Sequence, residues 1–254
     1  ADAGAAALSP FALDGALLAA LAPDVVITQD LCDVCAVPRA AVEAALARVA
    51  GRRVALVTLS PWRLDDLFRD LAAVARALGR EREGAAVAAA WRRRLDAVAR
   101  RAAAALHRPR VVTVEWLEPV MLGGTWMPEL VALAGGEAVG ARAGEKAPQP
   151  NSAELDRLDA EVVVVKPCGY PLPQTLAEAA TIRSALPLAR WPAGALGRVF
   201  VADGSAYFNR PGPRLVDSAE LLAALVQPAL FPDFAARYAG AFAPFCAARP
   251  APPP

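Results

Sequence analysis

Residues 85–106, with the sequence AAVAAAWRRRLDAVARRAAAAL, decide how the chain is organised, because they form one long run of helical character. A helix of that length spans about 33 Å at about 1.5 Å per residue. A β-branched run over residues 54–59, VALVTL, precedes the helical region, and another over 110–116, RVVTVEW, follows it. A helix this long between strand-bearing segments is more than a packing element, and we expect it to be a rigid spacer between two lobes.

Short strands alternate with helices on both sides of the spacer, which predicts α/β architecture with parallel sheets. The predicted strands are residues 24–28, 54–59, 110–116, 161–165 and 199–201. The predicted helices are residues 13–22, 39–50, 64–106 with a break at 79–84, 127–134, 152–158, 172–184 and 215–226. For the helix at 152–158 we expect no capping box, because Leu155 stands three positions after Ser152.

These elements predict two Rossmann-like lobes with parallel sheets, joined by a long rigid helix. A weak internal repeat supports two lobes, since residues 17–28 and 153–166 both contain a helix, a turn with a carboxylate and a valine-rich strand. The predicted boundaries are 1–80 for a partial N-terminal lobe, 81–108 for the interlobe helix, 109–228 for the C-terminal lobe and 229–254 for a Pro/Ala-rich tail.

Composition excludes several classes of protein. The 254 residues carry a net charge of +1, which is too little for the positive field of a nucleic-acid binder. Hydrophobic residues make up 56% of the chain, but no stretch of about 18 residues is free of charges and helix breakers, so no membrane span is predicted. There is one histidine, and no dinucleotide-binding, hydrolase or zinc-protease motif, so we expect no enzymatic activity.

The cysteines leave three alternatives open. Cys32 and Cys35 form a Cys-x-x-Cys pair after the first strand, and Cys168 follows the four-valine strand. These thiols are structural, or they hold zinc or iron, or they act as a redox pair. A zinc site needs further ligands, of which Cys168 is a candidate, whereas a redox pair favours a helix N-terminus, and here helix begins only after Pro38.

Aromatic residues gather in the loops that follow the strands of the second lobe. Trp126 follows a Gly-Gly pair, Tyr170 follows the valine strand, and Tyr207 and Phe208 lie after the last strand. Core packing is the plain interpretation of such residues. The functional interpretation is an apolar, aromatic wall for a flat or bulky ligand, with Arg210 available to contact an anion.

At these loops the sequence resembles the substrate-binding proteins of the cobalamin, siderophore and haem class of ABC importers, and within it the cobalamin-binding subgroup. Four segments carry the resemblance: PDVVITQDLCDVCAV at 23–37, WMPELVALAGGE at 126–137, VVVVKPCGY at 162–170 and DGSAYFNRPGPRLVD at 203–217. The likeness extends over residues 13–228. Members of the class have two α/β lobes joined by one long helix, in agreement with the organisation predicted above.

The resemblance implies a clamp that holds a corrinoid or a related metal-chelate ligand between the lobes and delivers it to an ABC permease. The aromatic residues named above and Arg210 would then contact the ligand, together with Gln29 and Asp30 in the loop after the first strand. The alternative function is a metal-binding or redox protein that uses Cys32, Cys35 and Cys168.

The start of the chain departs from the family pattern. Members open with a strand and a serine-rich turn, whereas this chain opens at Ala1 inside the first lobe, so we expect that lobe to be incomplete. No basic segment followed by an apolar one stands at the start, so no leader peptide is visible. We therefore expect a cytoplasmic protein, or a periplasmic one if a leader has been removed.

Overall fold

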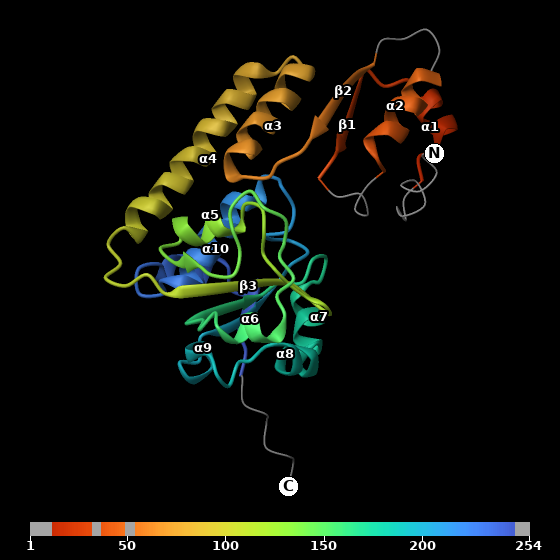
Figure 1. Cartoon of the computed structure of the whole chain (residues 1–254). Coiled ribbons are helices and arrows are strands. Elements are labelled where there is room, and N and C mark those ends of the chain that lie inside the picture. Colours follow the sequence, from red (N-terminus) through yellow and green to blue (C-terminus); the bar gives the residue numbers. More distant parts are fainter. Residues whose placement is uncertain (1–11, 32–36, 49–53, 247–254) are drawn as a thin grey trace. The chain divides into compact units, whose positions relative to one another are not determined.

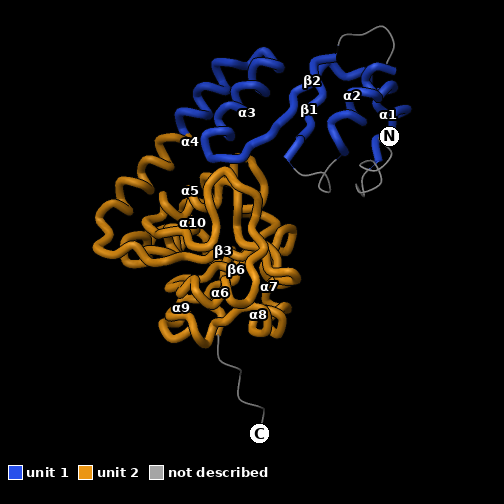
Figure 2. Tube along the Cα trace, in the orientation of Figure 1, with its two compact units in different colours: residues 1–90 blue, residues 91–254 orange. Residues whose placement is uncertain are grey.

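The computed structural model describes residues 12–31, 37–48 and 54–246. The chain divides into two compact units, residues 1–90 and residues 91–254, which are coloured separately in Figure 2. The division falls between Ala90 and Trp91, inside the segment 81–108 that the sequence assigns to the interlobe helix.

Unit 1 is built around a short parallel sheet. Its elements are α1 (Gly15–Leu21), β1 (Val25–Gln29), α2 (Arg39–Arg48), β2 (Ala55–Leu59) and α3 (Leu64–Ala77). Strands β1 and β2 pair in parallel, with Val25 opposite Ala55. Parallel pairing requires a crossover, and α2 lies in the segment that supplies it. The predicted βαβ pattern of this unit is confirmed.

The long helix is α4 (Glu81–Ala102), which is separated from α3 by three residues that include Gly79 in the left-handed region (φ 63°). Its C-terminal half belongs to unit 2, where Arg94 donates to Glu220 at 2.8 Å and to Asp217 at 2.6 Å. Glu220 also accepts from the Tyr238 hydroxyl at 2.6 Å. Burial alone would raise the pKa of Glu220, but the hydrogen bonds from Arg94 and Tyr238 hold this pKa below its usual value.

Unit 2 contains the larger sheet, with the strand order β4-β3-β6-β7-β8 and β5 paired to β3. Strands β5, β3, β6 and β7 are parallel, while β4 and β8 are antiparallel to their neighbours. The elements are β3 (Arg110–Leu117), β4 (Val120–Leu122), α5 (Met127–Leu133), β5 (Glu137–Ala138), α6 (Ser152–Asp156), β6 (Val162–Val165), α7 (Leu172–Ala177), α8 (Ala179–Ala185), α9 (Pro192–Ala195), β7 (Val199–Ala202), α10 (Arg214–Val226), α11 (Pro232–Arg237) and β8 (Phe242–Pro244).

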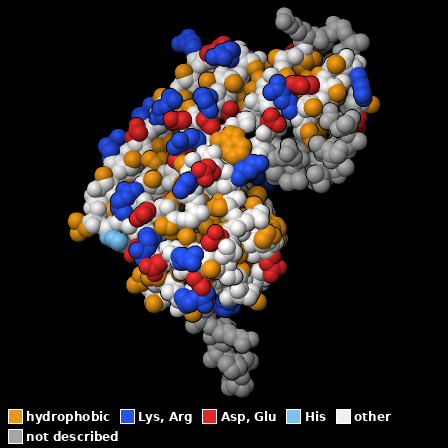
Figure 3. Space-filling view, viewed as in Figure 1, with side chains coloured by type: hydrophobic (Ala, Val, Ile, Leu, Met, Phe, Trp, Pro, Cys, Tyr) orange, Lys and Arg blue, Asp and Glu red, His pale blue; other side chains and the backbone are white. Residues whose placement is uncertain are grey.

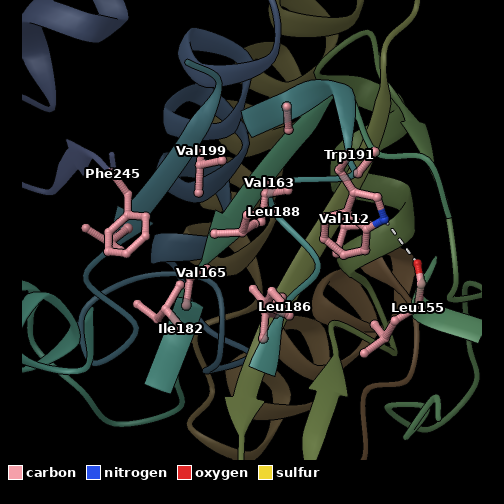
Figure 4. Close-up of a cluster of buried hydrophobic side chains, with 14 of the residues drawn as sticks. Val112, Leu155, Val163, Val165, Ile182, Leu186, Leu188, Trp191, Val199 and Phe245 are labelled. Atoms are coloured by element: carbon pink, nitrogen blue, oxygen red, sulfur yellow. Dashed lines mark hydrogen bonds between the residues drawn. The ribbon is translucent and has the colours of Figure 1, made fainter. Parts of the chain in front are cut away.

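Helices cover both faces of this sheet, with α5 and α10 on one side of β3 and α6, α8 and α9 on the other (Figure 1). All four valines of β6 are buried, as expected for a central parallel strand that is covered on both faces. On the α6 side the core includes Trp191, which is 1% exposed and donates its indole N–H to the Leu155 carbonyl at 3.1 Å (Figure 4). The predicted α/β class with parallel sheets is confirmed.

One local expectation is corrected. The helix at α6 does have a capping box, because its N-cap is Asn151 and not Ser152. The Asn151 side chain accepts from the Glu154 N–H at 3.1 Å, and the Glu154 carboxylate accepts from the Asn151 N–H at 2.8 Å. Within the Pro/Ala-rich segment 229–254, Phe231 and Phe234 at α11 are buried, and β8 pairs with β7.

Candidate functional site

Three segments of unit 2, the end of β3 and the loops after β6 and β7, meet at one edge of its sheet. Strands β3, β6 and β7 are parallel neighbours, so their carboxyl ends lie side by side. We call this region the carboxyl edge and define it as residues 115–118, 166–170 and 203–210. Ligands of open α/β sheets bind beyond the carboxyl ends of the strands, which makes this edge the candidate site.

Gly204 brings two of these loops into backbone contact. Its carbonyl accepts from the Gly169 N–H at 3.3 Å, and the Tyr170 carbonyl accepts from the Ser205 N–H at 3.1 Å. A Cβ added at Gly204 would lie 2.1 Å from the carbonyl oxygen of Pro167. Only glycine permits this close approach, so the segments 166–170 and 203–210 form one rigid surface.

A buried lysine stabilises the same junction. Lys166 is fully buried and donates from Nζ to Asn209 Oδ1 at 2.6 Å, with Glu115 Oε2 at 3.5 Å. The Asn209 amide donates in return to the carbonyls of Lys166 and Gly204, each at 2.9 Å. Burial lowers the pKa of Lys166, and the negative charge of Glu115 opposes that shift. The Lys166 side chain therefore fixes the loop from beneath and does not face solvent.

Trp126 and Phe208 are buried and stabilise the loop at 203–210. Trp126 is 4% exposed and donates its indole N–H to the Phe208 carbonyl at 2.8 Å. Phe208 is 1% exposed, has a φ of 68°, and donates its N–H to Ser218 Oγ at 2.9 Å. The structure thus places both predicted ligand contacts in the interior of unit 2, where they support the carboxyl edge.

The remaining predicted contacts of unit 2 lie at the carboxyl edge. Tyr170 is half-buried and meets Trp116 edge to face, with ring centroids 5.6 Å apart. Tyr207 is half-buried and packs edge to face on Tyr238 at 6.0 Å, and Arg210 is exposed. Trp116 was not among the predicted ligand contacts, although it lies at the end of a predicted strand.

Gln29 and Asp30 lie in unit 1, at the end of β1. The Gln29 side chain accepts from the Leu31 N–H at 3.0 Å, and the Asp30 N–H donates to the Leu59 carbonyl at 2.9 Å. The Asp30 side chain is exposed. Gln29 is thus the last residue of the parallel strand β1, and Asp30 follows it. The contact of both residues with a ligand stays a prediction.

The cysteines divide between described and undescribed parts of the chain. Cys32 and Cys35 lie outside the described residues. Cys168 lies on the carboxyl edge. Partial burial of its thiol raises the pKa of Cys168, although the positive charge of Lys166 opposes that shift, so the thiol is neutral at neutral pH. Over residues 12–31, 37–48 and 54–246, no group of three or more His, Cys, Asp or Glu is arranged to hold a metal ion. The metal and redox hypotheses stay predictions.

A family model described as "Periplasmic binding protein" matches residues 17–206. The chain belongs to this family. Members of the periplasmic binding protein family bind solutes and are not enzymes, as the sequence predicted. They are periplasmic or extracytoplasmic, so the cytoplasmic alternative has no support.

Solved structures with the same fold include other periplasmic binding proteins. A periplasmic heme-binding protein from Pseudomonas aeruginosa matches with a TM-score of 0.68 and 24% identity, covering 85% of this chain and 76% of that one. RhuT, a periplasmic heme-binding protein from Roseiflexus sp. RS-1, matches at 0.67 and 23%, covering 86% and 81%. The vitamin B12 binding protein BtuF of Vibrio cholerae matches at 0.64 and 18%, covering 86% and 79%.

These likenesses establish the two-lobe fold, and no curated protein matches the chain. Among the described helices of this periplasmic binding protein, none is both long enough and apolar enough to cross a bilayer. Acidic and basic side chains are interspersed on the face shown in Figure 3, in keeping with the net charge of +1. A single-sign field suited to nucleic acid is therefore absent from that face.

Proposed function

We propose that this periplasmic binding protein serves an ABC importer and holds a flat metal-chelate ligand, a corrinoid or a related ring such as haem. The observation that carries the proposal is the carboxyl edge, where Tyr170, Tyr207 and Arg210 lie on loops locked together by Gly204. The structural neighbours support the ligand class, since their names describe heme and vitamin B12 binding. An ABC permease is the partner that this function requires.

The chemistry of the edge suits such a ligand. Aromatic rings offer flat contact area at a low cost in side-chain entropy, and the phenols add a hydrogen-bonding group. The Arg210 guanidinium is matched to the carboxylate or phosphate groups that decorate a ring of this kind. Because the loops are already ordered by Asn209 and Gly204, less conformational entropy is lost when the ligand binds.

Equilibrium titration of the purified chain with cobalamin, cobinamide and haem tests the proposal. Binding is measured from the change in ligand absorbance. We expect saturable binding of at least one ligand, with a Kd in the micromolar range or below. The variant Arg210→Ala is expected to weaken binding at least about fivefold, because it removes a charge-assisted hydrogen bond.

Arg157→Ala is the matched control, since Arg157 is also exposed but precedes β6 and lies at the opposite end of the strand. It should bind as the unmodified chain does. Failure of all three ligands to bind at high micromolar concentration would contradict the proposed ligand class. Equal weakening by both variants would contradict the role given to Arg210.

A further inference from the structure

A small pocket lies at the carboxyl edge, and Arg210 is not among the residues that line it. Its volume is about 180 Å³, and its walls include Trp116, Tyr170, Glu118, Glu178 and Thr181. Pockets for whole drug-sized ligands measure roughly 300–1,000 Å³, so this one suits a small molecule or one substituent of a larger molecule.

The aromatic wall of the pocket is rigid. Trp116 and Tyr170 meet edge to face with an interplanar angle of 74°. The Trp116 indole N–H donates to the Glu118 carbonyl at 3.1 Å, which fixes the ring and satisfies its one polar group. The two rings are therefore held in place before anything binds.

The charge of the pocket is negative. Glu118 and Glu178 both line it, and Thr181 Oγ1 donates to a Glu178 oxygen at 2.9 Å, which orients that carboxylate. In the described part of the chain neither glutamate forms an ion pair with Lys, Arg or His. No basic side chain lines the pocket, so a positively charged occupant would gain from both carboxylates.

We propose that this pocket binds a small organic ammonium group. Aromatic faces attract a weakly hydrated cation through their quadrupole, and tryptophan does so most strongly. A quaternary or protonated amine combines apolar surface for the rings with charge for the carboxylates. An anion would be repelled by Glu118 and Glu178, and a neutral apolar group would gain nothing from their negative charge.

The ammonium site and the proposed ligand site share Tyr170 but differ in the charges that they use. The ammonium site needs Trp116 and the two glutamates, whereas the titration above depends on Arg210. A chain that binds no tetrapyrrole can still bind an ammonium ion in this pocket, and the reverse also holds.

Two-dimensional NMR of the indole N–H signals of the five tryptophans tests the inference. The Trp116 signal is assigned by its loss in Trp116→Phe. Tetramethylammonium chloride is titrated in place of an equal concentration of sodium chloride, so that the ionic strength stays constant. We expect a saturable shift of the Trp116 signal, and we expect Glu178→Gln to weaken the apparent affinity at least about threefold.

Glu137→Gln is the matched control, because it removes one exposed carboxylate at the start of β5, outside the pocket. It should leave the affinity unchanged. The neutral analogue tert-butyl alcohol should bind more weakly than tetramethylammonium. The inference is overturned if the shift of the Trp116 signal does not saturate, or if Glu178→Gln binds tetramethylammonium as tightly as the unmodified chain does. Binding of tert-butyl alcohol as tightly as tetramethylammonium would also overturn it.

Discussion

Gly204→Ala should weaken ligand binding at least about tenfold and lower the free energy of unfolding of unit 2 by about 1–3 kcal/mol, the usual cost of overpacking. The added Cβ would lie 2.1 Å from the Pro167 carbonyl oxygen and 2.7 Å from that of Lys166. Both are backbone atoms, which cannot rotate away as a flexible side chain can. The loops must therefore separate, and Tyr170 and Tyr207 lose their common surface. Titration with the bound ligand and urea denaturation measure the two effects.

Gly212→Ala is the control for this prediction. Gly212 lies near the same loop, but a Cβ there meets nothing within 4 Å, and its backbone is not in the left-handed region. We expect this variant to bind and unfold as the unmodified chain does. If Gly204→Ala also behaved like the unmodified chain, the two loops would not be locked, and the rigidity attributed to the carboxyl edge would be wrong.

Trp191→Ala should lower the free energy of unfolding of unit 2 by about 3–5 kcal/mol, as expected when a buried tryptophan is deleted. Trp191 is 1% exposed, and it lies among Val112, Val163 and Leu188 in the core of Figure 4. The change also leaves the Leu155 carbonyl without its indole donor. Urea denaturation followed by far-ultraviolet circular dichroism measures the loss.

Leu196→Ala provides the comparison. Trp191 and Leu196 flank the same short helix, α9, but Leu196 is 59% exposed. We expect it to change stability by less than about 0.5 kcal/mol, as surface substitutions usually do. A loss below about 1 kcal/mol for Trp191→Ala would mean that the cluster beneath β6 contributes far less to stability than its burial indicates.

The buried parallel strands could be predicted because their composition is distinctive. A central strand covered on both faces appears in sequence as an unbroken apolar run, and the valines of β6 follow that rule. The antiparallel edge strands β4 and β8 have only three residues each, too few for a periodic pattern. Strand β8 also falls in the Pro/Ala-rich segment, where pairing with β7 prevails over local composition.

The candidate site was predictable only in part. A strand end places Tyr170 and Tyr207 at the correct edge, but it does not show which way a side chain points. Trp126 was expected in a ligand wall, whereas its indole N–H finds the Phe208 carbonyl, a partner 82 residues away in sequence. The buried contact between Lys166 and Asn209 likewise depends on two loops meeting, which no local pattern reveals.

The small pocket shows the same limit. Trp116 ends β3, Tyr170 follows β6, and Glu178 and Thr181 belong to the boundary of α7 and to α8. Each residue is ordinary in its own segment. Only the sheet order, with β3 beside β6, brings the two rings together. The spacing of these residues in the sequence does not predict that they lie together.

Amide hydrogen exchange with and without saturating ligand tests the central claim most directly. The ligand is haem or a corrinoid, whichever titration shows to bind. We predict slower exchange on binding at the amides of 168–170 and 203–209, and unchanged exchange in α6 at the opposite end of β6. Protection confined to segments outside the carboxyl edge, with 168–170 and 203–209 unaffected, would contradict the account.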